Sequence, residues 1–98
     1  MFIAISRFEI ENGMDDAVKQ AFVNRPGLVD NHPGFIRLEV MSPTDNPAEI
    51  WLLTYWQNEN IFKDWHKNHL KESHKGIPKG LKLKPKSFKL QYFNHISS

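Results

Sequence analysis

Alternating apolar and polar side chains predict a strand with one buried face over residues 35–41. Residues 49–56 are apolar on both alternating faces, which is typical of a strand that is covered on both sides. Two further stretches rich in β-branched and aromatic residues, 2–10 and 87–96, complete a set of four predicted strands.

Apolar residues at helical spacing predict a helix between the first two strands and another after the third. The first covers residues 14–31, with Val18 and Phe22 on one stripe. We expect Pro26 to kink or break it, because proline removes a backbone donor and crowds the preceding turn. The second helix begins at a cap formed by Asn58 or Asn60, and its apolar stripe holds Ile61, Phe62 and Trp65.

The predicted order is strand, helix, strand, strand, helix, strand. This order is typical of the α+β ferredoxin-like plan, in which an antiparallel sheet carries both helices on one face. A length of 98 residues suits a single domain spanning residues 1–98. Residues 76–85 hold two glycines and two prolines, and they predict a long loop or flap.

The second face of such a sheet is open to solvent. We expect it to carry Phe2, Phe8 and some of Trp51, Leu53 and Tyr55, together with the intervening Ser6 of the first strand. An apolar face of this size favours aggregation in a monomer, so we expect a second copy, a ligand or both to cover it.

Composition narrows the possible function classes. Apolar residues are 40% of the chain and charged residues 24%, which argues against disorder of the whole chain. No apolar run is long enough to cross a membrane, no leader opens the chain, and the absence of cysteine rules out a disulfide framework or a thiolate site. We therefore expect a cytoplasmic protein without a membrane partner.

Charge is unevenly distributed along the chain. Residues 61–98 carry nine lysines against two acids, whereas residues 1–60 carry four cationic side chains against nine acids. The basic part suggests either an anionic partner or a solvated lysine surface. We expect no nucleic-acid partner, because the third strand lacks the paired aromatic motif of RNA-recognition sheets.

Motifs for phosphate loops or serine nucleophiles are absent, so histidines are the main candidates for chemistry. His66 and His69 are three residues apart and could bind a metal, but solvent-exposed histidines are the favoured interpretation of this pair. Trp65 and His74 are nine residues apart, which places them on opposite sides of an unbroken helix. They converge only if the helix breaks between them, and Asn68 is a plausible end of its first segment.

Three short segments give the chain a family resemblance: Val29 to Phe35 (VDNHPGF), Thr54 to Trp56 (TYW) and Phe62 to Trp65 (FKDW). At these separations the chain resembles the antibiotic biosynthesis monooxygenase (ABM) superfamily over roughly residues 2–75. The superfamily implies a dimeric α/β barrel, formed as a homodimer. Trp65 followed by His74 is similar to the haem-degrading branch, the IsdG-type and mycobacterial enzymes.

The resemblance implies roles for individual residues. His74 corresponds to the proximal ligand of the haem iron, Trp65 to the wall that distorts the porphyrin, and Phe22 to an aromatic lining residue. Ser6 stands where the branch has an asparagine whose amide positions the oxygen or water on the iron. A hydroxyl is shorter and less fixed in direction, which affects catalysis more than haem binding. The propionates would meet Arg25 or the flap lysines, namely Lys75, Lys79, Lys82 and Lys84.

Three hypotheses follow. The first is a haem-binding monooxygenase that degrades haem and releases iron, with electrons from an external reductase. The second is a cofactor-independent ABM monooxygenase that acts on a polycyclic phenol or quinol, with a histidine as the base. The third is a non-catalytic dimeric module that binds a ligand.

Overall fold

The structure is a computed structural model that describes residues 1–24, 32–73 and 80–98, with their side chains except those of 68–73. It contains six elements in the predicted order. They are strand β1 (Phe2–Glu9), helix α1 (Asp15–Val23), strand β2 (Phe35–Met41), strand β3 (Glu49–Trp56), helix α2 (Glu59–Ser73) and strand β4 (Lys89–Asn94).

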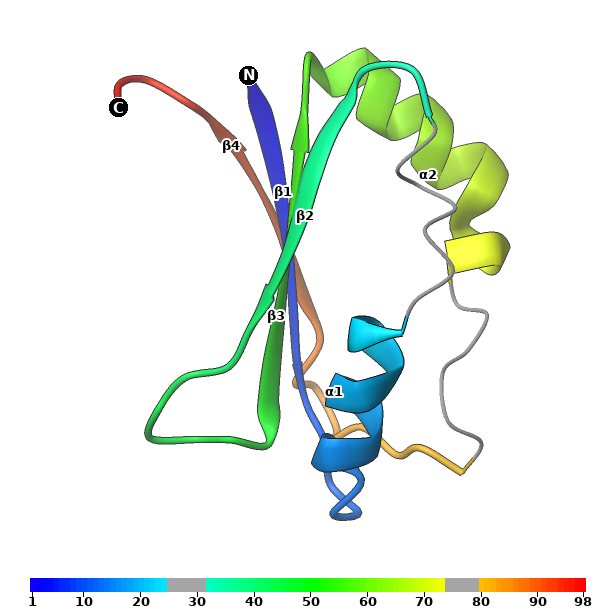
Figure 1. Cartoon of the computed structure of the whole chain (residues 1–98), viewed down its shortest axis with the longest axis vertical. Coiled ribbons are helices and arrows are strands. Elements are labelled where there is room, and N and C mark those ends of the chain that lie inside the picture. The colour runs from blue at the N-terminus through cyan, green and yellow to red at the C-terminus, as the bar shows by residue number, and fades with distance from the viewer. Residues whose placement is uncertain (25–31, 74–79) are drawn as a thin grey trace.

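The four strands form one antiparallel sheet in the order β2-β3-β1-β4. Both helices lie on the same side of this sheet, and the loop between β2 and β3 projects toward the other side (Figure 1). The ferredoxin-like prediction is therefore confirmed. The sheet is open at both edges within one chain, so a closed barrel would need a second copy.

Strand β1 presents to the helices the face that we expected to be open. Phe2 and Phe8 are buried in the clusters that α2 and α1 cover, and Ser6 lies on the same face by alternation. The expectation that these three residues face outward is wrong. Apolar residues begin both faces of this strand, and the charges of Arg7 and Glu9 decide its orientation, because ionised side chains remain on the solvated side.

Helix α1 ends before the predicted break at proline. Its last residue is Val23, and Asn24 follows as the C-cap, whereas residues 25–31 lie outside the described part of the chain. Val18 is buried and Phe22 packs against the same cluster, so the predicted stripe is confirmed.

Helix α2 is continuous from Glu59 to Ser73, so the predicted end of a first segment at Asn68 is wrong. The Asn58 side chain caps the helix, because its Oδ1 accepts a hydrogen bond from the Ile61 backbone N–H at 2.9 Å. Among the described residues, no helix is long and apolar enough to cross a membrane.

The described part of the predicted flap, residues 80–88, runs beside the end of β1. Leu83 forms an isolated antiparallel bridge with Ile10, and the Glu11 backbone N–H donates to the Lys82 carbonyl at 2.9 Å. The Lys84 side chain also pairs with the Glu9 carboxylate at 3.0 Å. This segment is therefore attached to the sheet by hydrogen bonds, and β4 begins only at Lys89.

A tight turn precedes β2, with the Phe35 N–H donating to the His32 carbonyl at 3.0 Å. Gly34 occupies its third position with a φ of +87°, as a type II turn requires. A Cβ at this position would meet the Ile61 side chain of α2, with Cγ2 at 2.9 Å. The turn thus brings the backbone directly against the second helix.

Replacing Gly34 with alanine is expected to destabilise the fold by about 2 kcal/mol, because a positive φ and a steric clash act together. Gly13→Ala is the matched control, since Gly13 has a φ of +73° but open space around its Cβ position. Urea unfolding of both variants would measure the difference. Equal losses in the two variants would contradict the proposed clash with Ile61.

Candidate ligand-binding site between the helices

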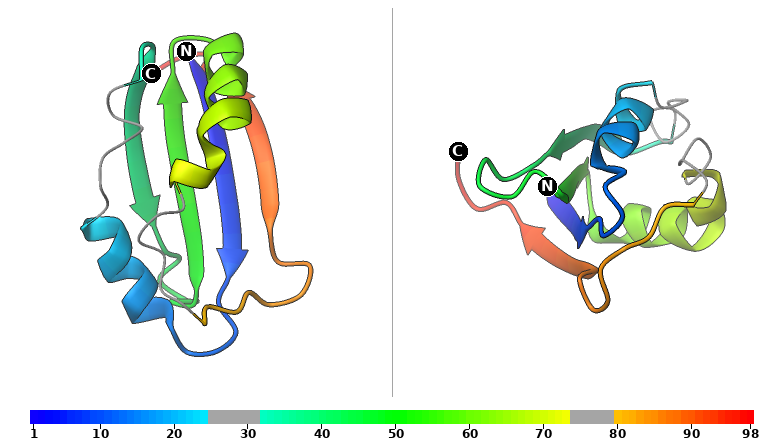
Figure 2. Two further views of the ribbon diagram at one scale, coloured as in Figure 1. Left: turned by 90° about the vertical axis from the view of Figure 1, so that its right-hand side faces the viewer. Right: turned by 90° about the horizontal axis from the view of Figure 1, so that it is seen from below.

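Two separate apolar clusters lie between the sheet and the helices. One joins the start of β1 and the end of β3 to α2 through Phe2, Trp56 and Phe62. The other joins the opposite ends of these strands to α1 through Phe8 and Val18. Figure 2 (left) shows α1 and α2 over opposite ends of the sheet, with the middle of β1 and β3 visible between them.

A row of four residues crosses the sheet between these clusters, and we call it the central row. The strand register places its members side by side across β2, β3, β1 and β4, namely Val40, Leu52, Ser6 and Leu90. None of the four is fully buried, whereas Phe2, Ala4 and Phe8 on the same face of β1 are buried. The central row therefore forms a largely apolar floor that the described side chains leave partly accessible.

Ser6 contributes the hydroxyl of this floor. The Ser6 hydroxyl makes no hydrogen bond within the described part of the chain. The buried side-chain polar atom that lacks a partner there is Trp56 Nε1, so the Ser6 hydroxyl reaches accessible space. A half-buried hydroxyl without a partner is able to donate one hydrogen bond to a ligand above the row.

Aromatic side chains from the two helices stand on opposite sides of the central row. Phe22 of α1 packs against the Phe8 cluster, and Trp65 of α2 packs against the Phe2 cluster. Trp65 is held by Trp56, whose ring centroid lies 5.5 Å away. Two aromatic walls and an apolar floor suit a flat apolar ligand.

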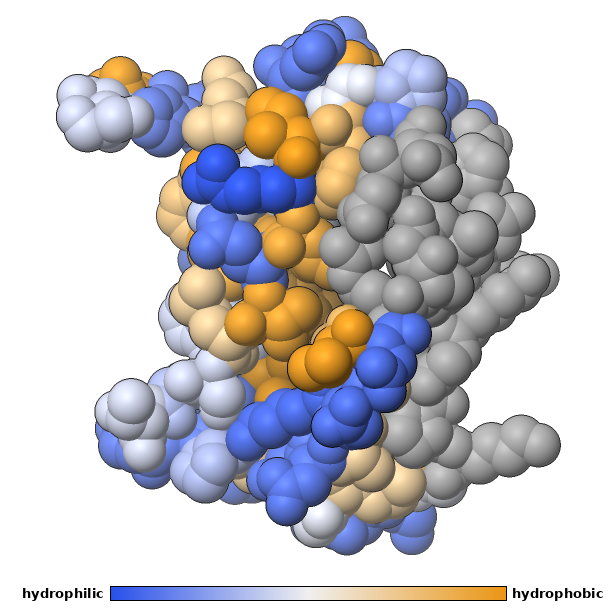
Figure 3. Space-filling view, viewed as in Figure 1, coloured by the Kyte–Doolittle hydropathy of each residue, from blue (hydrophilic) through white to orange (hydrophobic). Residues whose placement is uncertain are grey.

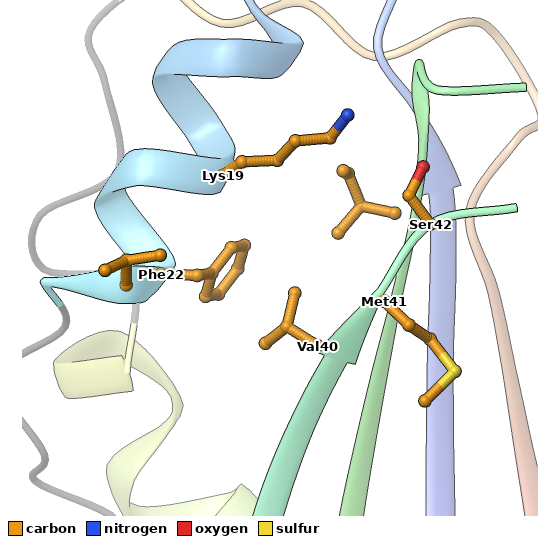
Figure 4. Close-up of a pocket in the computed structure, with 7 residues that line it drawn as sticks. Lys19, Phe22, Val40, Met41 and Ser42 are labelled. Carbon is orange, nitrogen blue, oxygen red and sulfur yellow. The ribbon is translucent and has the colours of Figure 1, made fainter. Parts of the chain in front are cut away.

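A pocket of about 280 Å³ extends from Phe22 and Val40 toward the edge of the sheet. Its lining is otherwise Val23, Met41 and Ile50, with Lys19 and Ser42 as the polar members. The Phe22 ring points toward Val40, and Lys19 reaches across toward Ser42 (Figure 4). Apolar side chains also gather at the surface between α1 and the β2 edge (Figure 3).

Other predicted site residues cannot be placed beside this row. His74 and Arg25 lie outside the described residues, as do Lys75 and Lys79 of the flap. Lys82 is exposed, and Lys84 is engaged by Glu9, whose side chain lies on the opposite face of the sheet from Ser6.

The histidine pair considered as a metal site is described only in part. His66 stacks against Phe62 with ring centroids 5.5 Å apart, and the side chain of His69 is not described. Within residues 1–24, 32–73 and 80–98, no group of three potential metal ligands occurs.

The open face of the sheet carries a second set of aromatic residues. Trp51, Leu53 and Tyr55 all lie there, where we expected some of them, because the alternating Ile50 and Trp56 are buried on the helix side. They are half-buried rather than fully exposed.

Cationic side chains cover part of this open face. The Arg37 guanidinium lies 4.0 Å from the centroid of the Tyr55 ring and 2.9 Å from the Glu39 carboxylate. The hydrogen bond from Arg37 is the main reason why the pKa of the Glu39 carboxylate is lowered, and a hydrogen bond from Tyr55 lowers it further. Arg7 similarly lies 5.1 Å from the centroid of the Trp51 ring. These contacts fix aromatic rings in place on a face that otherwise meets solvent.

Sequence reasoning missed the central row, apart from Ser6, and missed Lys19 and Ser42 of the pocket. Lys19 is three residues before Phe22, so helical spacing alone places it beside that ring. Ser42 lies just beyond the end of β2, where it was read as part of a loop. Only the packing of α1 on β2 brings these residues together.

Comparison with known proteins identifies a family and relatives to which this chain is similar. The model of the family described as antibiotic biosynthesis monooxygenase matches residues 1–75. A heme oxygenase (mycobilin-producing) from Mycobacterium tuberculosis is 23% identical over 74 residues, which are 76% of this chain and 70% of the relative.

Solved structures agree over nearly the whole chain. The haem-degrader MhuD from Mycobacterium tuberculosis, with two haems in its active site, has a TM-score of 0.81 at 19% identity, covering 100% of this chain and 98% of that one. A variant of SnoaB, a cofactor-independent oxygenase from Streptomyces nogalater, has a TM-score of 0.72 at 13% identity, covering 99% and 94%. At these identities the two likenesses concern the fold.

Proposed function

This chain belongs to the antibiotic biosynthesis monooxygenase family, and we propose that it binds haem, degrades it oxidatively and releases the iron. The observation that carries the proposal is the central row, a partly accessible apolar floor between the clusters that hold Phe22 and Trp65. The similarity to the mycobacterial heme oxygenase supports it.

The described residues fit the chemistry of haem. A porphyrin needs a wide apolar slot, and the central row supplies an apolar floor with aromatic side chains on both sides. Because α1 and α2 pack in separate clusters, we propose that a flat ligand lies between them, over the central row. The iron ligand would be His74, by the resemblance to the haem-degrading branch.

When bound, haem supplies the redox-active iron needed for chemistry with dioxygen. The protein's own residues orient the ring and control access of water. Trp65, supported by Trp56, presses on one side, and Phe22 limits movement on the other. The Ser6 hydroxyl donates one hydrogen bond above the floor, in place of the asparagine amide of the haem-degrading branch. Electrons come from an external donor.

Ser6 also favours a second candidate, a cofactor-independent oxygenase that acts on a polycyclic phenol or quinol. A hydroxyl positions oxygen less firmly than an amide, whereas an apolar slot accepts a flat aromatic substrate as readily as haem. The structural similarity to SnoaB supports this candidate. A histidine would then act as the base that deprotonates the substrate.

Turnover with ascorbate as the reductant, in air, separates the two candidates. Haem degradation predicts that the Soret absorbance of haemin-loaded protein decays while a ferrous chelator captures iron. Decay no faster than that of haemin without protein would overturn the proposal. Oxygen uptake with a quinol panel, in the absence of haem, would instead establish the second candidate.

We further propose that two copies pair through their open sheet faces as a homodimer. The face presents Ile3, Ile5, Leu53 and Tyr55 as a half-buried apolar surface, and pairing would remove it from water. The two sheets together would form the barrel that a single chain leaves open.

Replacing Leu53 with aspartate is expected to convert a dimer into a monomer, because a charge would be buried at the centre of this face. Val23→Asp is the matched control, since Val23 is 76% exposed on the helix side. Light scattering after size exclusion measures the mass of each variant. A wild-type protein that elutes at the mass of one chain, or an unchanged mass for Leu53→Asp, would contradict the pairing.

A further inference from the structure

We infer that the pocket beside Phe22 receives a carboxylate-bearing arm of the ligand and that Lys19 is its counter-charge. This inference rests on the proposed function, because it assigns the haem propionates a place at the same site. It names a specificity-determining residue that neither the sequence motifs nor the family match indicates.

The volume and the lining of the pocket suit such an arm. Its volume of about 280 Å³ is below the ~300–1,000 Å³ of sites that enclose a whole ligand, so it accommodates a part of a larger molecule. Phe22, Val40 and Ile50 make its lining apolar, and Lys19 with Ser42 forms its polar end. A propionate presents the same sequence, two methylene groups followed by an anion.

The pocket is also continuous with the proposed haem slot. Val40 is both a lining residue of the pocket and the β2 member of the central row. Phe22 likewise lines the pocket and forms one wall of the slot. A ring lying over Leu52 and Ser6 would therefore extend its substituents toward Lys19.

Lys19 is the side-chain donor that remains for an anion in this pocket. The Ser42 hydroxyl already donates to the Glu49 carbonyl at 2.7 Å. The other described residues that line the pocket have apolar side chains. Lys19 contacts Asp15 only at 3.9 Å, and its side chain is 35% exposed, so the ammonium can turn to a carboxylate in the pocket. An ammonium binds a carboxylate by a charge-assisted hydrogen bond.

Titration of the protein with haemin and with haemin dimethyl ester tests this inference. The ester keeps the ring and the iron but has no propionate charge. Lys19→Met keeps the length of the side chain and removes its charge. We expect this variant to bind haemin about tenfold more weakly than wild type, since the bond to a charged group is lost. Its affinity for the ester should equal that of wild type.

Lys63→Met is the matched control, because Lys63 lies on α2 in an ion pair with Glu59. It should bind both ligands as wild type does. Added salt should weaken haemin binding to wild type and leave binding to Lys19→Met nearly unchanged.

These outcomes distinguish a failure of the role assigned to Lys19 from a failure of the haem proposal. Equal haemin affinity of Lys19→Met and wild type, or an equal loss for haemin and the ester, would overturn the role of Lys19 while the haem proposal stands. A wild-type protein that binds neither ligand would overturn both.

Discussion

Replacing Ser6 with leucine is expected to abolish haemin binding, by at least about 100-fold in Kd, without destabilising the protein. Ser6 lies at the middle of the central row, between Leu52 and Leu90, and none of these three side chains is fully buried. A leucine side chain would occupy the slot between the two helices. The added apolar burial should raise the free energy of unfolding by about 1 kcal/mol or leave it unchanged.

This combination of effects separates a binding slot from an ordinary core position. Overpacking a filled core costs stability, whereas filling an open slot does not. Ile5→Leu is the matched control, because Ile5 precedes Ser6 in β1 but faces the other side of the sheet. Haemin titration and urea unfolding of both variants provide the measurement. A Ser6→Leu variant that binds haemin with wild-type affinity would exclude this row as the floor of the site.

Replacing Trp56 with alanine is expected to cost about 3–5 kcal/mol, which is most of the stability of a small domain. Trp56 is 0% exposed, and its ring lies 5.2 Å from Phe35 and 5.5 Å from both Phe62 and Trp65, measured between centroids. The indole thus connects β3, the start of β2 and helix α2. Its loss would also remove the support of Trp65, so haemin affinity should fall with stability.

Trp56→Phe is the informative companion variant. It keeps an aromatic ring in the cluster and removes the indole N–H, which is buried without a hydrogen-bond partner. An unpaired buried donor costs about 1–3 kcal/mol, so part of the lost packing is offset. Urea unfolding should rank the free energy of unfolding as wild type, then Trp56→Phe, then Trp56→Ala. A loss below about 1 kcal/mol for Trp56→Ala would show that the cluster does not depend on this residue.

Strands β2 and β3 could be predicted to the residue, because local sequence alone specifies them. The alternating pattern of β2 and the continuous apolar run of β3 are bounded by the glycine turn at Gly34 and by the two prolines of the 42–48 loop. The orientation of β1 could not be read in the same way, since both of its faces begin with apolar residues. Which face is buried depends on the helices that pack on it, and these are distant in sequence.

Helix ends were predicted less well than helix positions. Helix α1 stops at Val23, three residues before Pro26, so the proline marks the end only approximately. Helix α2 continues through Asn68, because a single asparagine lowers helix propensity by well under about 1 kcal/mol. Within Glu59–Ser73 the helix therefore has no break that would turn His74 toward Trp65.

Some residues of the candidate site could be predicted from the sequence, whereas others come together only in the folded protein. Ser6, Phe22 and Trp65 follow from a resemblance, and the structure places Phe22 and Trp65 against separate clusters on the face of the sheet that also carries Ser6. The pocket at Lys19 forms between α1 and the end of β2, so no local sequence pattern predicts it.

Absorbance titration with haemin tests the haem proposal most directly, with wild type and His74→Ala compared side by side. The proposal predicts a saturable Soret shift in wild type, and loss of that shift when the imidazole is removed. A wild-type protein without a Soret shift, or a shift that persists unchanged in His74→Ala, would contradict it.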